Sequence, residues 1–412
     1  MKNINFGLIF KWFFVWAGLH AAFPQADSLR IMSYNLLMYP SGTSYSRDAY
    51  LTDIVASYSP DIFAVCELET ARAADRLLNN VMQPIDPDYA AADFEPNHSD
   101  PNGTLQQLVF YNRRKLVLYA QSYVITEVRD INRYDFYLRS PYLQTGDTIF
   151  IHVYVVHLKS SQGYENEQKR YRMISALLSD AAALPSEHYT VVAGDFNFYY
   201  DGEPGFEALT DTAFVHQFQD PVHREGYWHE NRTFAPLHTQ SPNRNKGGNF
   251  VGGGLDDRFD FIFLSANLTD SLQPVHYRTG SYAAYGNNGN CFNGNINDPA
   301  CSGPYSQNLR DDLYEMSDHI PVVLTLVTDF PLTAAEKFAV SHFRIYPVPA
   351  KEFLHVEAPR NSRYAITDQT GKIIMRHLDG KKGKWYIGHL KPGIYYIRNE
   401  TYPAEGAAFI KL

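Results

Sequence analysis

The chain has 412 residues, of which 45% are hydrophobic and 20% charged, a composition typical of a globular protein with a sizeable core. The formal net charge is -9, and because residues 341–412 are rich in Lys and Arg, the acidic excess lies in residues 27–340. A domain with this acidic excess is a poor non-specific binder of polyanions such as nucleic acid, and it is better suited to binding divalent cations. The alternative is that the charge serves only solubility.

The first 26 residues have the features of a signal peptide. Lys2 provides a positive charge, the apolar run Phe6–Ala22 is interrupted by Lys11, and Ala26 offers a small residue for cleavage. The run is too short and too interrupted for a membrane span, although an uncleaved anchor is the alternative. No other run approaches membrane-spanning length, so we expect no stable membrane span after processing.

Runs rich in β-branched and aromatic residues recur through the next 300 residues or so, as expected for strands. They are Leu29–Tyr34, Asp61–Cys66, Leu105–Tyr111, Tyr134–Arg139, Thr148–Val156, Tyr189–Ala193, Arg258–Leu264 and Pro321–Val327. Apolar residues at helical spacing occur between them, in Arg47–Tyr58, Thr70–Val81 and Glu165–Ala183. This mixture predicts an α+β fold, a four-layer α/β/β/α sandwich of two mostly antiparallel sheets.

The pattern changes near residue 330. We predict a main domain in residues 27–330, a linker in 331–342 and, in 343–412, a small β-sandwich of short strands with Gly and Pro turns. Within the main domain, Arg278–Leu309 is rich in Gly and Asn and shows no periodicity, which predicts a long loop. Cys291 and Cys301 lie in this loop and could close it with a disulfide in an oxidising compartment, whereas Cys66 is expected to be a buried thiol.

Polar residues stand at the ends of six strand-like runs. The clusters are Ser33-Tyr34-Asn35, Cys66-Glu67, Val155-Val156-His157, Gly194-Asp195-Phe196-Asn197, Arg258-Phe259-Asp260 and Ser317-Asp318-His319. A single cluster would be an ordinary turn or helix cap. A buried strand has no reason to end in such residues unless the end opens on a shared cleft, so six clusters predict one common site.

In this order the six clusters resemble the endonuclease/exonuclease/phosphatase superfamily of pancreatic-deoxyribonuclease-like enzymes, over about Leu29 to Val327. The resemblance implies that Glu67 is a carboxylate ligand of Mg²⁺, with Mn²⁺ or Ca²⁺ as alternatives. It implies that Asn35 helps to hold the metal and the phosphate, and that Asp318 is a further acid close to the metal.

The resemblance also assigns the catalytic roles. It implies that Asp195 positions or deprotonates the attacking water and that Asn197 donates to a phosphate oxygen. His319 would contact the scissile phosphate, oriented by Asp260, and His157 would contact the phosphate or protonate the leaving group. The chemistry supports these residue types, because phosphoester hydrolysis needs an activated water, a neutraliser for phosphate oxygens and help for the leaving alkoxide.

The C-terminal segments Ile345–Ala350, Ala365–Ile373 and Leu390–Tyr396 are similar to the type IX secretion C-terminal sorting domain. This resemblance implies contact with the type IX secretion machinery, passage across the outer membrane to a secreted or cell-surface location, and removal of the module. The alternative is a carbohydrate-binding or generic β-sandwich module.

The leading functional hypothesis is a secreted, metal-dependent phosphoesterase acting on phosphodiesters, with nucleic acid as a candidate substrate. A second is a phosphatase or a sphingomyelinase-like phospholipase, which exposed aromatic hairpins such as Phe198-Tyr199-Tyr200 would favour. A third is a non-catalytic surface-binding protein on the same scaffold. Every motif position keeps a competent side chain, which argues against the third. No oligomeric state is predicted.

Overall fold

The computed structural model describes residues 26–144, 148–213, 217–332, 344–357, 363–369, 372–377, 382–399 and 406–412. The predicted signal peptide, residues 1–26, and the predicted linker, residues 331–342, lie almost entirely outside these ranges. No helix in the described ranges is both long enough and apolar enough to cross a membrane.

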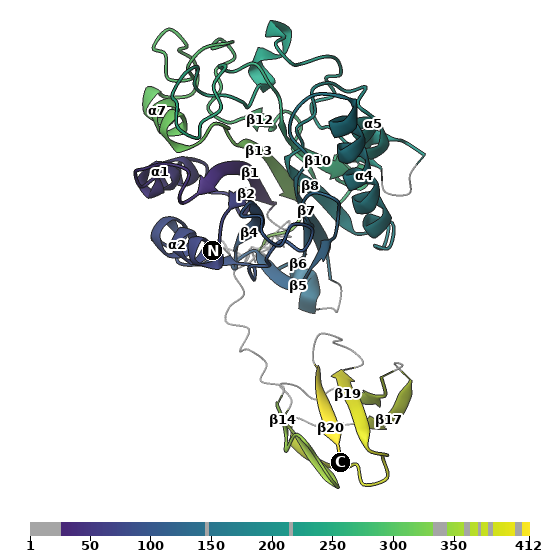
Figure 1. Ribbon diagram of the computed structural model, residues 1–412. Coiled ribbons are helices and arrows are strands. Elements are labelled where there is room, and N and C mark those ends of the chain that lie inside the picture. The colour runs from purple at the N-terminus through teal and green to yellow at the C-terminus, as the bar shows by residue number, and fades with distance from the viewer. Residues whose placement is uncertain are drawn as a thin grey trace, which may run out of the picture.

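Two sheets face each other in the larger domain (Figure 1). The first has seven strands in the order β11-β13-β1-β2-β4-β3, with β12 also paired to β13. Its strands are β1 (Asp27–Tyr39), β2 (Ile62–Leu68), β3 (Tyr89–Ala91), β4 (Gln106–Asn112), β11 (Val275–Tyr277), β12 (Ala283–Ala284) and β13 (Val322–Thr328). Only β1 and β2 pair in parallel, so the sheet is mostly antiparallel.

The second sheet has six strands in the order β5-β6-β7-β8-β10-β9. These are β5 (Leu116–Val124), β6 (Ile131–Leu138), β7 (Phe150–His157), β8 (Tyr189–Asp195), β9 (Phe218–Gln219) and β10 (Asp260–Ser265). Its single parallel pair is β7 with β8, and α4 supplies the crossover that such a pair requires.

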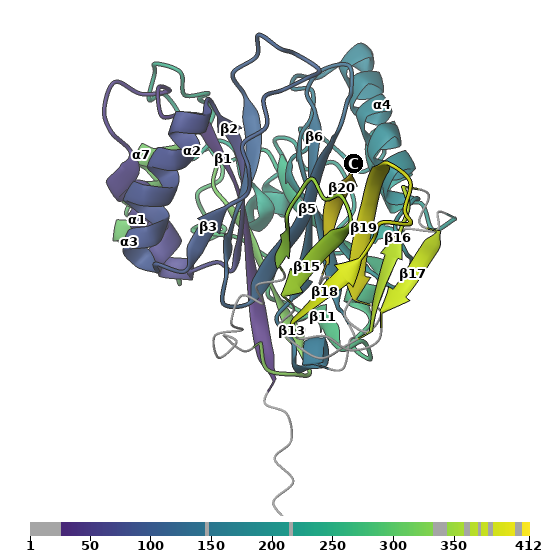
Figure 2. The ribbon, with the colours of Figure 1, turned by 90° about the horizontal axis from the view of Figure 1, so that it is seen from below.

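Helices cover the outer face of each sheet, which completes the predicted four layers (Figures 1 and 2). On the first sheet lie α1 (Asp48–Tyr58), α2 (Ala71–Leu77), α3 (Gln83–Ile85) and α7 (Gln307–Met316). On the second lie α4 (Tyr164–Ala181) and α5 (Pro204–Thr210). Shorter helical segments are η1 (Leu78–Met82), η2 (Pro141–Gln144), η3 (Arg232–Leu237) and α6 (Ala266–Thr269). The predicted α+β sandwich is therefore confirmed.

Strand β7 shows why the central strands are apolar along their whole length. Val153 and Val155 belong to the core between the two sheets. Tyr154 and Val156 point the other way and pack in the outer core with Leu177 of α4. Because successive side chains point to opposite faces, a strand covered on both sides needs apolar residues at every position.

Two segments differ from the sequence prediction. The predicted helix Thr70–Val81 is divided, because α2 ends at Leu77 and a π-helical turn continues to Met82. The predicted loop Arg278–Leu309 contains the short strand β12 and the first turn of α7. It also holds a disulfide between Cys291 and Cys301, with Cα atoms 5.3 Å apart, and Cys66 is a buried free thiol.

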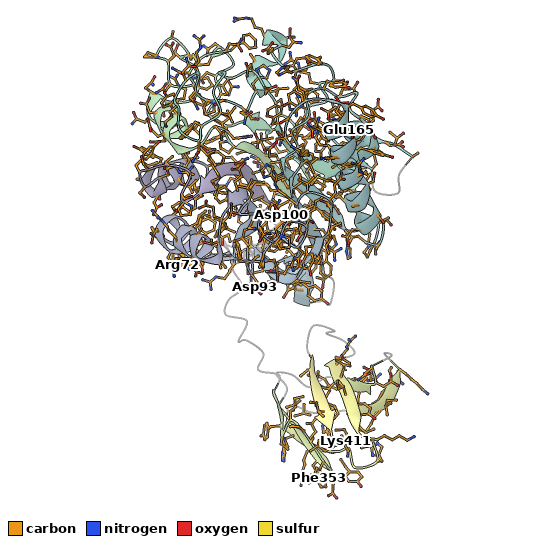
Figure 3. The ribbon with its side chains drawn as sticks, in the orientation of Figure 1. Arg72, Asp93, Asp100, Glu165, Phe353 and Lys411 are labelled. Atoms are coloured by element: carbon orange, nitrogen blue, oxygen red, sulfur yellow. A yellow bond between two sulfur atoms is a disulfide. The ribbon has the colours of Figure 1, made fainter. Side chains whose placement is uncertain are left out.

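The C-terminal module consists of two small antiparallel sheets, as predicted. One is β14 (Arg344–Tyr346), β15 (Phe353–Glu357) and β18 (Lys382–Tyr386), and the other is β16 (Tyr364–Thr367), β17 (Ile373–His377), β19 (Gly393–Asn399) and β20 (Gly406–Lys411). Leu354, Trp385 and Phe409 are among the residues of its own buried core. Figure 3 shows Phe353 on β15 and Lys411 on β20.

Candidate active site

Strand register aligns three of the predicted residues in the second sheet. Asp195 is the last residue of β8, and it pairs with His157, the last residue of β7. On its other side Asp195 pairs with Asp260, the first residue of the antiparallel strand β10. The three residues therefore lie side by side at neighbouring strand ends, on the same side of the domain.

The first sheet brings its polar residues to the same end of the domain. Asn35 of β1 pairs with Cys66 of β2, which places Glu67 one residue further on. Strand β13 runs antiparallel to β1 and begins opposite Ser33, so Asp318 and His319 directly precede it at that end.

Asn35 connects the two sheets through its side-chain amide. Its Nδ2 donates to Glu67 Oε1 at 3.0 Å and to Asp195 Oδ2 at 3.2 Å. Its Oδ1 accepts from the Leu37 amide, and Glu67 Oε2 accepts from the Met38 amide, each at 3.0 Å. The amide of Asn35 thus fixes the separation of two carboxylates that come from different sheets.

His319 is held from both sides of its ring. Nδ1 lies 2.7 Å from Asp260 Oδ2, and Nε2 lies 2.7 Å from Gln240 Nε2 and 3.8 Å from Asp195 Oδ2. With the ring neutral, Nδ1 donates to Asp260 and Nε2 accepts from the amide of Gln240. Once Nε2 is protonated, the Gln240 side chain must turn its oxygen toward the ring or give way to another acceptor.

His157 faces the same carboxylates from β7. Its Nε2 lies 3.5 Å from Asp195 Oδ2 and 3.8 Å from Glu67 Oε1. Arg129, in the loop before β6, donates from Nη1 to the carbonyl oxygens of His157 and Leu158, each at 2.9 Å. A guanidinium therefore stands beside the His157 edge of the site.

Asn197 and Asp318, the last two of the predicted site residues, are held in place by contacts with backbone groups. The Asn197 amide donates to Asp195 Oδ1 at 3.1 Å, and its Nδ2 reaches the Leu158 carbonyl at 3.4 Å. Asp318 is buried, and its Oδ2 accepts from the Val251 amide at 3.0 Å. Both residues are held by the loops that border the strand ends.

The acids and histidines of the site shift one another's ionisation. Burial raises the pKa of Asp195 to about 7; the charge of His319 opposes this, and Asp260 and Glu67 add to it. Burial also raises the pKa of Asp318. For His319, burial lowers the pKa, but Asp260 and Asp195 outweigh it and hold the pKa well above its ordinary value.

His157 shifts in the opposite direction. Burial, followed by the charges of Arg129 and His319, lowers its pKa well below the ordinary value. The two environments therefore shift the histidine pKa values in opposite directions, so that the charged form is favoured more for His319 than for His157.

The donor set fits a hard divalent cation. Glu67 and Asp318 bring carboxylates, and Asp195 stands next to them. Burial, and to a lesser extent the charges of Asp260 and Glu67, raises the pKa of Asp195, and a nearby cation would favour its ionised form. Asp195, Asp260 and His319 each offer a ligand atom within 4.8 Å of the others. Asp260 and His319 are already bonded to each other, whereas the side chain of Glu67 keeps 15% of its surface exposed and can face an ion that retains waters.

All the residues that the sequence singled out for the site lie at this end of the two sheets. Direct contacts join seven of them: Asn35, Glu67, His157, Asp195, Asn197, Asp260 and His319. The eighth, Asp318, precedes His319 in the chain. Their individual roles stay predictions. Arg129 and Gln240 also contact the site, and the sequence patterns did not single them out. Arg129 stands two residues before β6, so a search for charges that precede antiparallel strands could have found it. Gln240 lies in a loop and carries no local signal.

Comparison with known proteins identifies two family matches along the chain. Residues 32–319 match the model of the Endonuclease/Exonuclease/phosphatase family, and residues 344–404 match the secretion system C-terminal sorting domain. No curated protein matches the sequence significantly.

Solved structures that the chain resembles include the human Nocturnin catalytic domain with bound sulfate (14% identity, 74% of this chain and 97% of that chain, TM-score 0.46). A second is D. rerio TDP2 complexed with single-strand DNA product (16% identity, 73% of this chain and 99% of that chain, TM-score 0.45). A third is a Bacteroides thetaiotaomicron endonuclease/exonuclease/phosphatase family protein (16% identity, 75% of this chain and 100% of that chain, TM-score 0.45).

The family match covers more than half of the chain and contains every residue of the site. Members of this family hydrolyse phosphoesters and are generally dependent on divalent metals, and the C-terminal sorting domain points to export. By its sequence match and its four-layer fold, the chain belongs to the endonuclease/exonuclease/phosphatase family.

Proposed function

We propose that this protein is a secreted, Mg²⁺-dependent phosphodiesterase that cleaves its substrate by attack of a water molecule on phosphorus. The observation that carries the proposal is the bridge made by Asn35 between Glu67 and Asp195, with the His319–Asp260 pair next to it. This arrangement collects metal ligands, a candidate base and a charged histidine around one point.

Glu67 and Asp318 would hold the cation, and Asn35, predicted to help hold the metal, would do so by fixing the Glu67 carboxylate through its amide N–H. When bound, the cation supplies positive charge for the phosphate oxygens and lowers the pKa of a coordinated water. Side chains of the protein itself orient the water, accept its proton and contact the phosphate oxygens.

Asp195 is the proposed base. Its Oδ2 is fixed by Asn35 at 3.2 Å, and its Oδ1 accepts from the backbone of Asn197 at 3.1 Å, so the carboxylate is oriented on both oxygens. A water oxygen bonds to phosphorus, its proton passes to Asp195, and the bond from phosphorus to the leaving oxygen breaks. The leaving oxygen takes up a proton from solvent water, and Asp195 returns the proton that it accepted to solvent.

The two histidines flank this reaction. His319 can donate from Nε2 to a phosphate oxygen once Gln240 yields that position, and Asp260 holds the ring through Nδ1. His157 directs Nε2 toward Glu67 and Asp195, where it can donate a hydrogen bond to a phosphate oxygen or to the leaving group. Asn197 adds an amide on the same side.

Of the two aromatic segments that would favour the lipid alternative, Phe198-Tyr199-Tyr200 and the Tyr-rich loop 278–305, the first lacks the expected exposure. Phe198 is fully buried, and Tyr199 and Tyr200 are half-buried, so this segment is not an exposed aromatic hairpin. The non-catalytic alternative is decided by the assay that follows.

The test measures hydrolysis of bis(p-nitrophenyl) phosphate by the purified full-length chain in Mg²⁺, Mn²⁺ or Ca²⁺. We expect turnover that EDTA abolishes, and a loss of about 100-fold or more in kcat for Asp195→Asn and for His319→Gln. Turnover that persists in EDTA would disprove the metal assignment. Absence of turnover with all three ions would favour the non-catalytic scaffold.

A matched control lies on strand β7. His152 Nδ1 is 2.6 Å from Asp135 Oδ1, so this pair is built like His319–Asp260 but stands away from the strand end. His152→Gln should keep its activity, apart from any loss that its thermal stability explains. If His152→Gln and His319→Gln lose activity equally, the site assignment fails.

Export is the second part of the proposal. The sorting domain in residues 344–404 supports passage through the type IX secretion machinery, and the predicted signal peptide in 1–26 would direct the first step. Deleting residues 344–412 should leave the protein inside the producing cell, which fractionation and immunoblotting would measure. Unchanged release to the medium would contradict this part alone.

A further inference from the structure

Four polar aromatic rings form a connected group beside the site. Ring centroids are 5.2 Å apart for Tyr199 and His229, 6.0 Å for His229 and Tyr227, and 5.8 Å for Tyr227 and Tyr200. We call Tyr199, Tyr200, Tyr227 and His229 the aromatic shelf. Tyr227 is 52% exposed and the other three are half-buried, so the shelf is open to solvent.

One end of the aromatic shelf continues directly from β8. Tyr199 follows Asn197 by two residues, and its ring packs on Phe259 with centroids 4.9 Å apart. The Phe259 carbonyl in turn accepts from the Phe196 amide at 2.8 Å. The short chain therefore limits the separation of Tyr199, the first residue of the shelf, from Asn197 to about 7 Å and from Asp195, four residues away, to about 14 Å.

The other end connects to the His319 side of the site. His229 Nδ1 lies 2.5 Å from Asp257 Oδ1. The Asp257 carbonyl accepts from the Gln240 amide at 3.1 Å, and the side chain of Gln240 contacts His319. The aromatic shelf is thus tied to both flanks of the reacting centre.

Neighbouring aromatic residues show that these rings are not simply the edge of the core. Phe198 and Trp228, which alternate with the shelf residues in sequence, are fully buried and pack in the outer core. The rings left outside all carry a polar atom, either a hydroxyl or an imidazole nitrogen. Exposed and clustered aromatic side chains mark binding surfaces more often than incidental exposure.

The charge around the aromatic shelf selects its ligand. Three acids lie at its His229 end, namely Asp256, Asp257 and Glu230. There they disfavour a phosphate and offer acceptors for amino groups. At the Tyr199 end the Arg170 guanidinium lies 5.6 Å from the ring centroid. The shelf rings carry hydroxyl and imidazole groups, and carboxylates stand at one end, so an acyl chain placed on it would meet polar atoms. A flat ring with hydrogen-bonding edges, next to a phosphodiester, fits these conditions.

We propose that the aromatic shelf stacks a nucleobase of a single-stranded nucleic acid whose scissile phosphate lies at the Asp195 site. The inference rests on the proposed phosphodiesterase function and names its substrate class. Stacking does not depend on base identity, because every base has a flat face.

The test compares an octamer of deoxyadenosine with an abasic strand of the same length, by kcat/KM for the full-length protein. We expect a preference of about tenfold or more for the base-bearing strand, the effect of one stacked base. Tyr227→Ala and Tyr199→Leu should each reduce this preference. Tyr119→Ala, a change of a 62% exposed ring on β5, should keep it.

Failure of this inference and failure of the proposed function give different results. If the protein cleaves both strands equally well, the shelf proposal is overturned and the phosphodiesterase stands. If it cleaves neither, fluorescence anisotropy of labelled strands in EDTA decides: tighter binding of the base-bearing strand, lost in Tyr227→Ala, supports the shelf, and equal binding overturns it. Binding to phosphatidylcholine vesicles that depends on Tyr227 would also overturn it.

Discussion

Gly194 is the position at which a single methyl group should do most damage to the site. A Cβ atom built there would lie 1.9 Å from the carbonyl oxygen of Val156, its pairing partner on β7. Real Cβ contacts essentially never fall below 3.0 Å, so one strand must move by about 1 Å. The φ angle of +144° is also one that residues with a side chain rarely adopt.

The size of the effect follows from these two costs. Overpacking of a close contact costs about 1–3 kcal/mol, and backbone strain at such a φ adds about 1–3 kcal/mol. Gly194→Ala should therefore lower the free energy of unfolding by about 2–6 kcal/mol. His157 and Asp195 are the next residues along the two strands, and a displacement of about 1 Å there can cost roughly 100-fold in rate.

Calorimetry of the full-length chain and kcat/KM on a phosphodiester measure the two effects separately. Gly163→Ala is the control, because Gly163 also has a positive φ, +104°, but a Cβ there meets nothing within 4 Å. The reasoning is refuted if the two variants have the same unfolding temperature. It is refuted for the site alone if Gly194→Ala is unstable but retains full activity per folded molecule.

Two further predictions concern stability. Arg170→Met leaves the fully buried carboxylate of Glu203 without its partner at 2.7 Å, and should cost about 3–5 kcal/mol. Arg172→Met breaks an ion pair whose arginine side chain is 51% exposed, and should cost less than about 1 kcal/mol; equal unfolding temperatures for the two variants would contradict this. Reducing the disulfide between Cys291 and Cys301, ten residues apart, should cost about 3 kcal/mol in denaturant titration, and an unchanged midpoint would contradict the estimate.

Much of the fold could be predicted because its central strands are buried on both faces. Strands such as β2 and β8 are continuous apolar runs, and no surface face interrupts their pattern. Strand β5 was missed because it is an edge strand with exposed residues, which weakens the signal. Helix α7 was not predicted, and its first residues were assigned to the preceding loop, which is rich in Gly and Asn.

Some residues of the site could be predicted from local sequence, and others could not. Residues such as Asp195 and Asp260 stand at strand ends, and local sequence marks such ends even before the pairing of the strands is known. Gln240 reaches His319 because its backbone bridges both Asp257 and His319. That contact joins residues 79 positions apart and is set by tertiary packing, so no local pattern could reveal it.

The central claim is that side chains from both sheets surround one cation and one phosphate. Anomalous diffraction from crystals of the full-length protein grown with Mn²⁺ and a non-hydrolysable phosphodiester analogue tests it most directly. The account predicts one dominant manganese peak at the carboxylate of Glu67, with the phosphate between the ion and His319. A peak elsewhere, or a phosphate bound away from Asp195 and His319, would contradict it.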